Sequence, residues 1–332
     1  MAQVVAAISM SHAPGITGWP DAPAPAVRQR VGAGMQELAA YLDAARPDVI
    51  VALLDDHFEN HYRNLMPTFA VAIAPSHKGP AEYWLEALRL ERQQAIPGAP
   101  ELATSLLGRL VHGGFDAARM GEIEYGNNLM VPLALIRPQA DIPVIPVFIN
   151  VFTPPLPKVR RAYALGEAIR QSVEEWPRDL RVAFLATGGL SHWPPFWQEK
   201  SPASDRFLQR MKRYQTEGRA VLAADPDLMV DLGAYEIEMA RQSNRPLVNP
   251  QWDRSFLDML ARGDVAGMWA LGYDEVEEQA GHGGHEILNW VAVMGAMRGR
   301  PARIVLYEEV IEWITGVALA VYDIPAPESG GD

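Results

Sequence analysis

The sequence predicts an α/β protein with a central mixed β-sheet, helices on both faces of that sheet, and a helix-rich C-terminal part. Strand-like and helix-like segments alternate along the chain, which is the pattern of a layered α/β fold. Two strand segments, 48–54 and 180–187, are almost wholly apolar, as expected for strands covered on both faces. No repeat and no linker interrupts the pattern. Residues 1–324 are therefore expected to form a single α/β catalytic domain, and the Pro/Gly/acidic tail 325–332 is expected to be disordered.

The N-terminal part of the chain begins the alternation. The expected elements are a strand over 4–10, a helix over 26–45, strands over 48–54 and 68–74, and a largely helical stretch over 80–111 that is broken near Pro97 and Pro100. The helix over 26–45 carries Val27, Val31, Met35 and Leu38 at helical spacing, which predicts one buried face.

The remaining elements continue the same order. They are a strand over 142–151, a helix over 158–175, a strand over 180–187, helices between 205 and 298, and a last strand near 303–307. The strand over 142–151 contains Pro143 and Pro146. Because proline cannot donate a backbone hydrogen bond, we expect this strand to lie at an edge or to contain a bulge.

Composition limits the kinds of function. The net charge is −12 and no basic run occurs, which argues against nucleic acid and anionic membranes as partners. The chain has no cysteine, so disulfides, thiolate nucleophiles and Cys-type zinc sites are excluded and any metal must be held by His, Asp or Glu. No signal-peptide pattern and no apolar run of about 18 residues is present, so we expect a cytoplasmic enzyme.

Candidate metal ligands follow several of the expected strands. His12, Asp56, His57 and His192 each come shortly after a strand, and ligands of open α/β sheets bind at the carboxyl ends of strands. Two neutral imidazoles and one carboxylate form a non-haem Fe(II) site that leaves positions open for other ligands. A further histidine could transfer protons near neutral pH. We therefore expect these residues to meet at one edge of the sheet.

Glu286 is the candidate carboxylate. It follows the glycine-rich segment 281–284 and begins a helix whose inward face continues at Trp290. A glutamate at a helix start can simply favour the helix dipole, but an inward carboxylate needs a partner, and a metal is one. His282 and His285 are possible competing ligands.

Each of these residues also has a structural interpretation. His12, in front of Ala13-Pro14-Gly15, would by itself be interpreted as a turn histidine. His57 and His61 are spaced like a zinc-peptidase pair, but the glutamate of the H-E-x-x-H motif is missing, so His61 is interpreted as a surface or substrate-rim residue. Asp56 is a candidate for orienting the neighbouring His57.

Taken together, the motifs resemble those of the class III (LigB-type) extradiol ring-cleaving dioxygenases, and most closely the single-chain 2,3-dihydroxyphenylpropionate 1,2-dioxygenase type. The matching segments are Ser11-His12, Asp56-His57, 66–69 (MPTF), 143–150 (PVIPVFIN), 165–169 (LGEAI), 188–192 (GGLSH), 249–253 (NPQWD) and His285-Glu286 with Trp290. The resemblance covers almost the whole chain. It implies a LigB-like fold and an enzyme that inserts both atoms of O2 into an aromatic substrate during aromatic catabolism.

The resemblance also implies a role for each matching residue. His12, His57 and Glu286 correspond to ligands of Fe(2+), and His192 corresponds to the catalytic base. The family usually has Asp-His-Gly where this chain has Glu124-Tyr125-Gly126. A tyrosine can donate a hydrogen bond but cannot become a cation, so Tyr125 is expected to hydrogen-bond substrate or product and to alter substrate preference. A small aromatic substrate, O2 and a homo-oligomer are the expected partners.

Three alternatives remain open from the sequence. The same metal site could act on an aminophenol, a hydroxypyridine or a methoxylated diol. A Zn-dependent hydrolase could use His57 and His61, and a non-catalytic relative could only bind an aromatic compound. Arg63, Arg210 and Arg245 could bind a substrate carboxylate, although surface charge is the favoured interpretation of all three.

Overall fold

A computed structural model describes residues 1–242 and 247–324 of the chain, so the predicted disordered tail 325–332 lies outside the described residues. Within these residues the largest sheet has eight strands in the order β6-β3-β7-β2-β8-β1-β10-β9. Its strands are β1 (Ala2–Met10), β2 (Val49–Leu54), β3 (Phe69–Ala72), β6 (Ala118–Met120), β7 (Val144–Ile149), β8 (Leu180–Thr187), β9 (Ala302–Val310) and β10 (Thr315–Tyr322). β4 (Ser76–Gly79) and β5 (Gln94–Pro97) form a separate antiparallel pair.

Three neighbouring parallel strands form the middle of the sheet. β8 pairs in parallel with β1 on one side and with β2 on the other. In this register Met10 lies opposite Thr187, and Leu53 lies opposite Ala186. The carboxyl ends of the three strands therefore meet at one edge, which is where the sequence analysis expected the candidate ligands.

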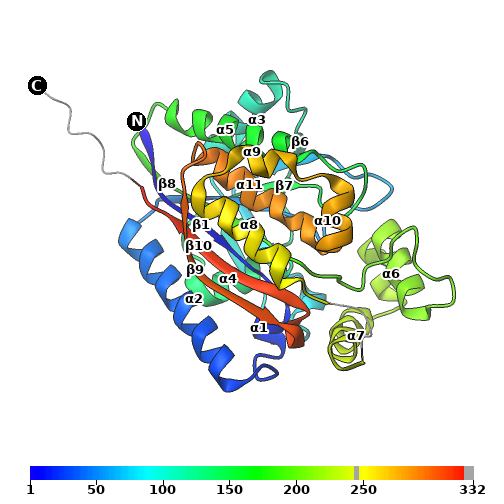
Figure 1. Cartoon of the computed structure of the whole chain (residues 1–332). Helices are drawn as coiled ribbons and strands as arrows, with labels where there is room; N and C mark the ends of the chain where they lie inside the picture. The colour runs from blue at the N-terminus through cyan, green and yellow to red at the C-terminus, as the bar shows by residue number, and fades with distance from the viewer. Residues whose placement is uncertain (243–246, 325–332) are drawn as a thin grey trace, which may run out of the picture.

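Helices cover both faces of the sheet, as predicted (Figure 1). The helices are α1 (Gly15–Gly18), α2 (Pro25–Ala45), α3 (Pro100–His112), α4 (Asn127–Ile136), α5 (Val159–Glu174), α6 (Arg206–Glu217), α7 (Leu228–Gln242), α8 (Pro250–Arg262), α9 (Val265–Ala270), α10 (Tyr273–Gln279) and α11 (Ile287–Ala296). Short 3-10 helices are η1 (Glu82–Trp84), η2 (Arg219–Ala223), η3 (Gly283–Glu286) and η4 (Ile311–Trp313). α2 and α4 pack on one face, and α5 and α11 pack together on the other.

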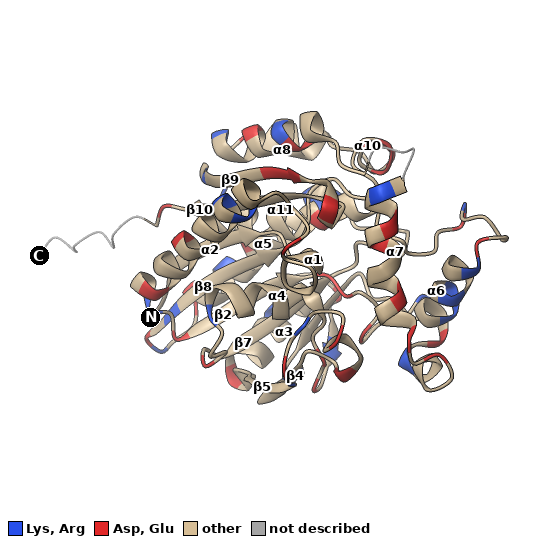
Figure 2. Ribbon diagram, turned by 90° about the horizontal axis from the view of Figure 1, so that it is seen from below, with Lys and Arg blue, Asp and Glu red and all other residues tan. Residues whose placement is uncertain are grey.

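The charged residues lie mainly on the helices and loops around the sheet, whereas most strands are uncharged (Figure 2). α11 is buried along its whole length, because it packs between α5 and the parallel strands. α6 and α7 lie together at one end of the molecule, in the helix-rich C-terminal part (Figure 1). The α/β class expected from the sequence is thus confirmed.

Two local predictions were wrong, and one strand was missed. The stretch 80–99 is not a continuous helix but contains η1 and β5, with Pro97 ending the strand. β7 lies inside the sheet, not at its edge. Val147 is the last residue of β7 that pairs with β3, and the neighbouring Pro146 lies outside that pairing. The N–H that Pro146 lacks is therefore not needed for hydrogen bonds to β3. The sequence analysis also missed β10, an apolar strand that pairs with β1.

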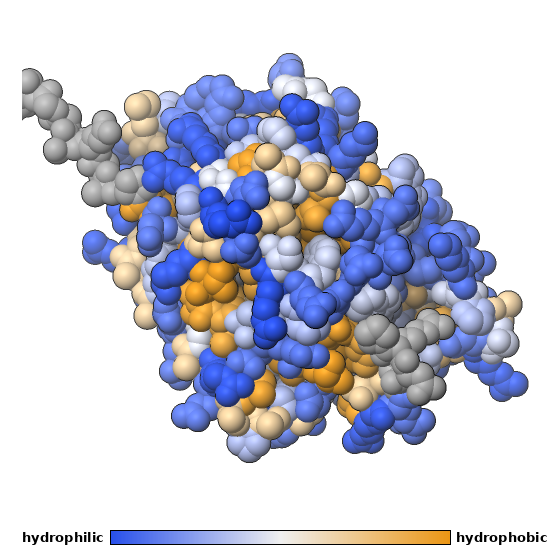
Figure 3. All heavy atoms as spheres, in the orientation of Figure 1, coloured by the Kyte–Doolittle hydropathy of each residue, from blue (hydrophilic) through white to orange (hydrophobic). Residues whose placement is uncertain are grey.

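The face shown in Figure 3 is largely hydrophilic, with apolar residues gathered in patches at its centre and in its lower half. Among the described helices, none combines the length and the apolar character needed to cross a bilayer.

Candidate metal centre

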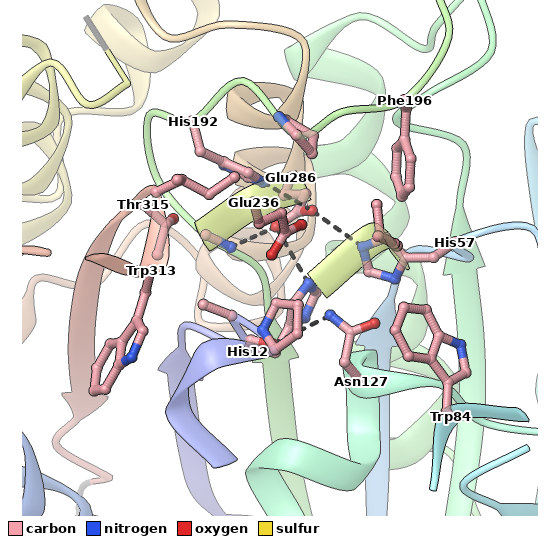
Figure 4. A pocket seen from close by; sticks show the side chains of 16 residues that line it. His12, His57, Trp84, Asn127, His192, Phe196, Glu236, Glu286, Trp313 and Thr315 are labelled. Carbon is pink, nitrogen blue, oxygen red and sulfur yellow. Dashed lines mark hydrogen bonds and ion pairs between the residues drawn. The ribbon is translucent and has the colours of Figure 1, made fainter. Parts of the chain in front are cut away.

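Four donor residues meet at the carboxyl edge of the parallel strands. They are His12 after β1, Asp55 and His57 after β2, and Glu286 at the end of η3. One ligand atom from each lies within 4.8 Å of every other, and all four residues are buried. Figure 4 shows His12, His57 and Glu286 converging from different elements. Three of the four are the predicted metal ligands, and residues more than 200 positions apart in the chain thus share one site.

The distances between these side chains are short enough for a shared ion. Glu286 Oε2 lies 3.3 Å from His12 Nε2, and Glu286 Oε1 lies 3.4 Å from His57 Nε2. Asp55 Oδ2 lies 3.3 Å from the same His57 nitrogen. His12 Nε2, Asp55 Oδ2 and Glu286 Oε1 are buried and have no hydrogen-bond partner. Such unpaired polar atoms are costly, and a cation between them would satisfy all three.

The tautomer of His12 follows from its neighbours. The Thr187 hydroxyl donates its one proton to the Asn128 carbonyl oxygen, at 2.6 Å. Thr187 Oγ1 must therefore accept the hydrogen bond from His12 Nδ1, at 3.1 Å. The proton of a neutral His12 ring then resides on Nδ1, and the lone pair of Nε2 points to Glu286. This is the state in which imidazole binds a metal.

The ring of His192 is also held by a hydrogen bond at Nδ1, as the ring of His12 is. Its Nδ1 lies 2.8 Å from the Leu190 carbonyl oxygen, which can only accept, so Nδ1 is the donor. Its Nε2 lies 3.4 Å from Glu286 Oε1 and faces the pocket (Figure 4). Only glycine fits at position 283, because a Cβ there would lie 2.3 Å from this Nε2. His192 is not among the four mutually close donors.

Backbone and amide groups fix the carboxylates. Gly189 N–H donates to Glu286 Oε2, and a Cβ at Gly188 would approach the Glu286 Cβ to 2.8 Å. Asn289 Nδ2 donates to both Asp55 Oδ1 and the Thr187 carbonyl oxygen, each at 2.8 Å. The GGLSH segment therefore fits closely around Glu286, and Asn289 ties the ends of β2 and β8 together.

The electrostatics of the cluster favour a positive charge at its centre. Burial raises the pKa of Glu286, but His12 and His192 outweigh burial and hold that pKa well below its ordinary value. Burial lowers the pKa of His57, but Asp55 and Glu286 outweigh burial and raise it to about 10. Burial and then Glu286 raise the pKa of Asp55 to about 6. Two imidazoles and carboxylate oxygens are a donor set that suits non-haem Fe(II), so these residues fit such an ion.

A pocket opens directly over the cluster, with an empty volume of about 450 Å³, open solvent included. Its lining residues are His12, Ala13, Pro14, His57, Trp84, Asn127, Gly189, His192, Pro194, Phe196, Leu232, Glu236, Glu286, Trp313, Ile314 and Thr315. The pocket thus combines apolar and aromatic walls with the polar residues of the cluster and with Asn127, Glu236 and Thr315.

Tyr125 does not line this pocket. It is fully buried, its ring lies 5.8 Å from that of His77, and its hydroxyl has no hydrogen-bond partner. Asn127 lines the pocket from the same segment instead, with Nδ2 donating to the His12 carbonyl oxygen. The role predicted for Tyr125 stays a prediction, and the position of its side chain does not support direct contact with a substrate.

Other candidate histidines have different partners. His282 Nε2 lies 2.6 Å from the Pro194 carbonyl oxygen, and His285 pairs with Glu277 at 3.2 Å. His61 is buried beside Phe148 and lines a separate small cavity. None of these three belongs to the candidate metal group found among the described residues.

Asp56 does not orient His57. Its carboxylate accepts from the backbone N–H groups of Asn60 and His61 and so closes the turn after β2. Glu59 accepts from the His57 N–H at 2.8 Å.

The sequence analysis missed Asp55 and Glu236. Asp55 could have been noticed, because side chains alternate along an extended chain and Asp55 and His57 share one side. Glu236 has no motif around it, and only the position of α7 reveals it.

The fold and the site define a class: an α/β protein with a buried histidine–carboxylate cluster under an apolar pocket. The chain matches, over residues 6–320, the family described as the catalytic LigB subunit of aromatic ring-opening dioxygenase. It belongs to this family of ring-cleaving enzymes, as the motifs predicted.

Among its relatives are two proteins named 2,3-dihydroxyphenylpropionate/2,3-dihydroxicinnamic acid 1,2-dioxygenase. The one from Rhodococcus sp is 32% identical over 324 residues, covering 95% of this chain and 97% of the relative. The one from Burkholderia vietnamiensis is 30% identical, and the match covers 92% of this chain and 93% of the relative. The crystal structure of an uncharacterized Escherichia coli K12 protein has a TM-score of 0.50 and 14% identity, and covers 96% of this chain and 100% of its own. At that identity it shows a likeness of fold alone.

Proposed function

We propose that this protein is an Fe(II)-dependent extradiol dioxygenase that opens the ring of a catechol-type aromatic with O2. His12, His57 and Glu286 would hold the metal. The observation that carries the proposal is the convergence of these three buried donors, each with a side-chain atom that has no hydrogen-bond partner, at the floor of an aromatic pocket. The family, and relatives named for the dioxygenation of dihydroxyphenyl compounds, favour this reaction over hydrolysis.

A bound Fe(II) would supply adjacent open positions for the diol oxygens and O2 and a path for electron density between them. The chain's own residues would do the rest. In the neutral ring, His192 Nε2 carries the lone pair and accepts the proton of a phenolic hydroxyl, while the Nδ1–H stays on the Leu190 carbonyl oxygen. Trp84 and Phe196 flank the ring and exclude water. Asp55 adds negative charge beside His57.

The zinc-hydrolase alternative has less support. It needs His57 and His61 on one ion, yet His61 lines a different cavity and its Nδ1 lies 3.7 Å from Asp56. Metal analysis of protein loaded with Fe(II) or Zn(II), combined with oxygen uptake on a panel of catechols, separates the two. We expect one O2 consumed per ring opened, both oxygen atoms in the product, and activity with iron only.

A separate test distinguishes the proposed base, His192, from the proposed metal ligand His57. His192→Gln should retain bound iron and lose about 10²- to 10⁴-fold in kcat, because a general base of this kind contributes that much. His57→Ala should lose the iron itself. Iron content by elemental analysis and oxygen uptake measure the two effects separately. Loss of iron in His192→Gln, or full iron in His57→Ala, would contradict the assignment.

A further inference from the structure

Glu236 is a second carboxyl group in the pocket, apart from the metal cluster. It lies on α7 and is 5% exposed, and its Oε2 is buried without a hydrogen-bond partner. Figure 4 shows its side chain among the residues that line the pocket. Leu232 lines the pocket one helical turn earlier, so one face of α7 forms part of the wall.

The described lining contains no lysine and no arginine. Two arginines that the sequence suggested as carboxylate binders are engaged elsewhere. Arg63 pairs with Glu199 and lies over the Trp197 ring, and Arg210 pairs with both Asp225 and Asp231. The third, Arg245, lies outside the described residues. The described wall around Glu236 therefore offers no lysine or arginine to pair with either Glu236 or a carboxylate on a substrate.

The other polar residues of the lining are Asn127, His192 and Thr315, and the wall is otherwise apolar. Outside the cluster at the floor, the pocket presents Trp84, Phe196, Trp313 and Ile314 beside Leu232. These side chains suit an aromatic ring but distinguish poorly between polar substituents. Glu236 is the buried acid that a substituent would meet above the cluster.

We propose that Glu236 recognises the ring substituent, and that the pocket selects aromatic diols whose substituent carries an N–H or O–H donor, neutral or cationic, over diols bearing a carboxylate. This inference rests on the proposed function for its diol. A buried acceptor without a partner favours a ligand that supplies a donor and rejects one that supplies a second negative charge. Burial raises the pKa of Glu236 to about 8, partly offset by His192 and His57, so Glu236 is fully charged only above that pH.

The test compares four catechols that differ only at the 3-position: aminoethyl, hydroxyethyl, propionate and the methyl ester of the propionate. At pH 9, where Glu236 is ionised, we expect kcat/KM of the iron-loaded wild type for the amine and the alcohol to exceed that for the propionate by about tenfold or more, because two like charges in a dry pocket repel. Dissociation constants measured by calorimetry without oxygen should follow the same order.

Glu236→Gln keeps the shape and removes the charge. We expect it to lower the preference for amine over propionate by about tenfold, which equals 1.4 kcal/mol, and to change the ester least. The matched control is Glu238→Gln, an exposed glutamate on the same helix, which should leave every ratio unchanged. Equal thermal midpoints of the variants and the wild type would show that the fold is kept, and Glu236→Ala should shift the ratio in the same direction.

The results separate this inference from the proposed function. Binding in the expected order without oxygen uptake would overturn the dioxygenase proposal but support the role of Glu236. Oxygen uptake with a preference for the propionate, or with ratios that Glu236→Gln does not move, would overturn the role of Glu236 alone. Neither binding nor uptake with any of the four compounds would overturn both.

Discussion

At the scale of single residues, the Thr187 hydroxyl decides which nitrogen of His12 is free. It donates to Asn128 and accepts from His12 Nδ1. Thr187→Val removes that acceptor while keeping the shape, so the ring loses the contact that fixes its tautomer and orientation. We expect the affinity for Fe(II) to fall about 10- to 100-fold, as for other residues that orient a ligand. Anaerobic titration with Fe(II) measures this.

Thr315→Val is the matched control for that prediction. Thr315 lines the same pocket, is buried, and has an Oγ1 without a hydrogen-bond partner. Its valine variant should bind Fe(II) like the wild type. Equal losses of affinity in the two variants would mean that the pocket as a whole is disturbed and that the His12 tautomer is not the cause.

At the scale of elements, α8 holds the segment that carries His192. Asp253 on α8 accepts from the backbone N–H and the hydroxyl of Ser191, at 2.7 and 2.9 Å, and from the Tyr307 hydroxyl at 2.8 Å. One buried carboxylate thus connects a helix, the loop after β8 and the edge strand β9. His192 is the next residue after Ser191, so its position depends on this connection.

Asp253→Asn weakens that connection, because an amide offers one acceptor oxygen where the carboxylate offers two. We expect a loss of about 1–3 kcal/mol in the free energy of unfolding and a fall of about tenfold or more in kcat from misplacement of His192, with iron retained. Thermal denaturation, oxygen uptake and iron analysis measure the three effects.

Asp258→Asn is the control for the effect of an Asp-to-Asn substitution on α8 itself. Asp258 lies on α8 but pairs with Arg262 at the surface, with a side chain 63% exposed. Exposed pairs of this kind contribute little, so Asp258→Asn should keep both stability and kcat. An Asp253→Asn variant that behaves like it would rule out the proposed positioning role.

At the scale of the whole molecule, the proposed metal ligands come from residues 12, 57 and 286 and so connect distant parts of the chain. A metal that binds the folded chain alone stabilises it, by about 2.7 kcal/mol when free metal is 100-fold above its dissociation constant. We expect Fe(II) under nitrogen to raise the thermal midpoint of the wild type and to leave that of His12→Ala unchanged.

A histidine outside the site provides the control. His112 is exposed at the end of α3, and His112→Ala should show the full stabilisation by metal. Stabilisation that persists in His12→Ala would place the ion elsewhere. The homo-oligomer and the cytoplasmic location expected from the sequence stay predictions, as does the single domain. Sedimentation analysis would test the first of these.

Local patterns predicted much of the fold because they depend on neighbours in the chain. The strand over 180–187 was predicted with its observed bounds, and the helix over 26–45 differs by one residue. The stretch 80–99 could not be predicted in this way, since its backbone follows contacts with other elements and not its own helix propensity. β10 was missed for a similar reason: its apolar residues gain stability only when the strand pairs with β9 and β1.

The sequence by itself determined the class of fold and the family, and it predicted His12, His57, His192 and Glu286 as site residues, because motifs and strand ends are local features that a single chain displays. Only the tertiary structure decided that Asp55 belongs to the cluster, that Asn127 and not Tyr125 lines the pocket, and that Glu236 lies in the pocket wall. The physical reason is that a pocket is made by side chains from distant segments. Which side of a turn or helix faces it depends on packing that no local pattern specifies.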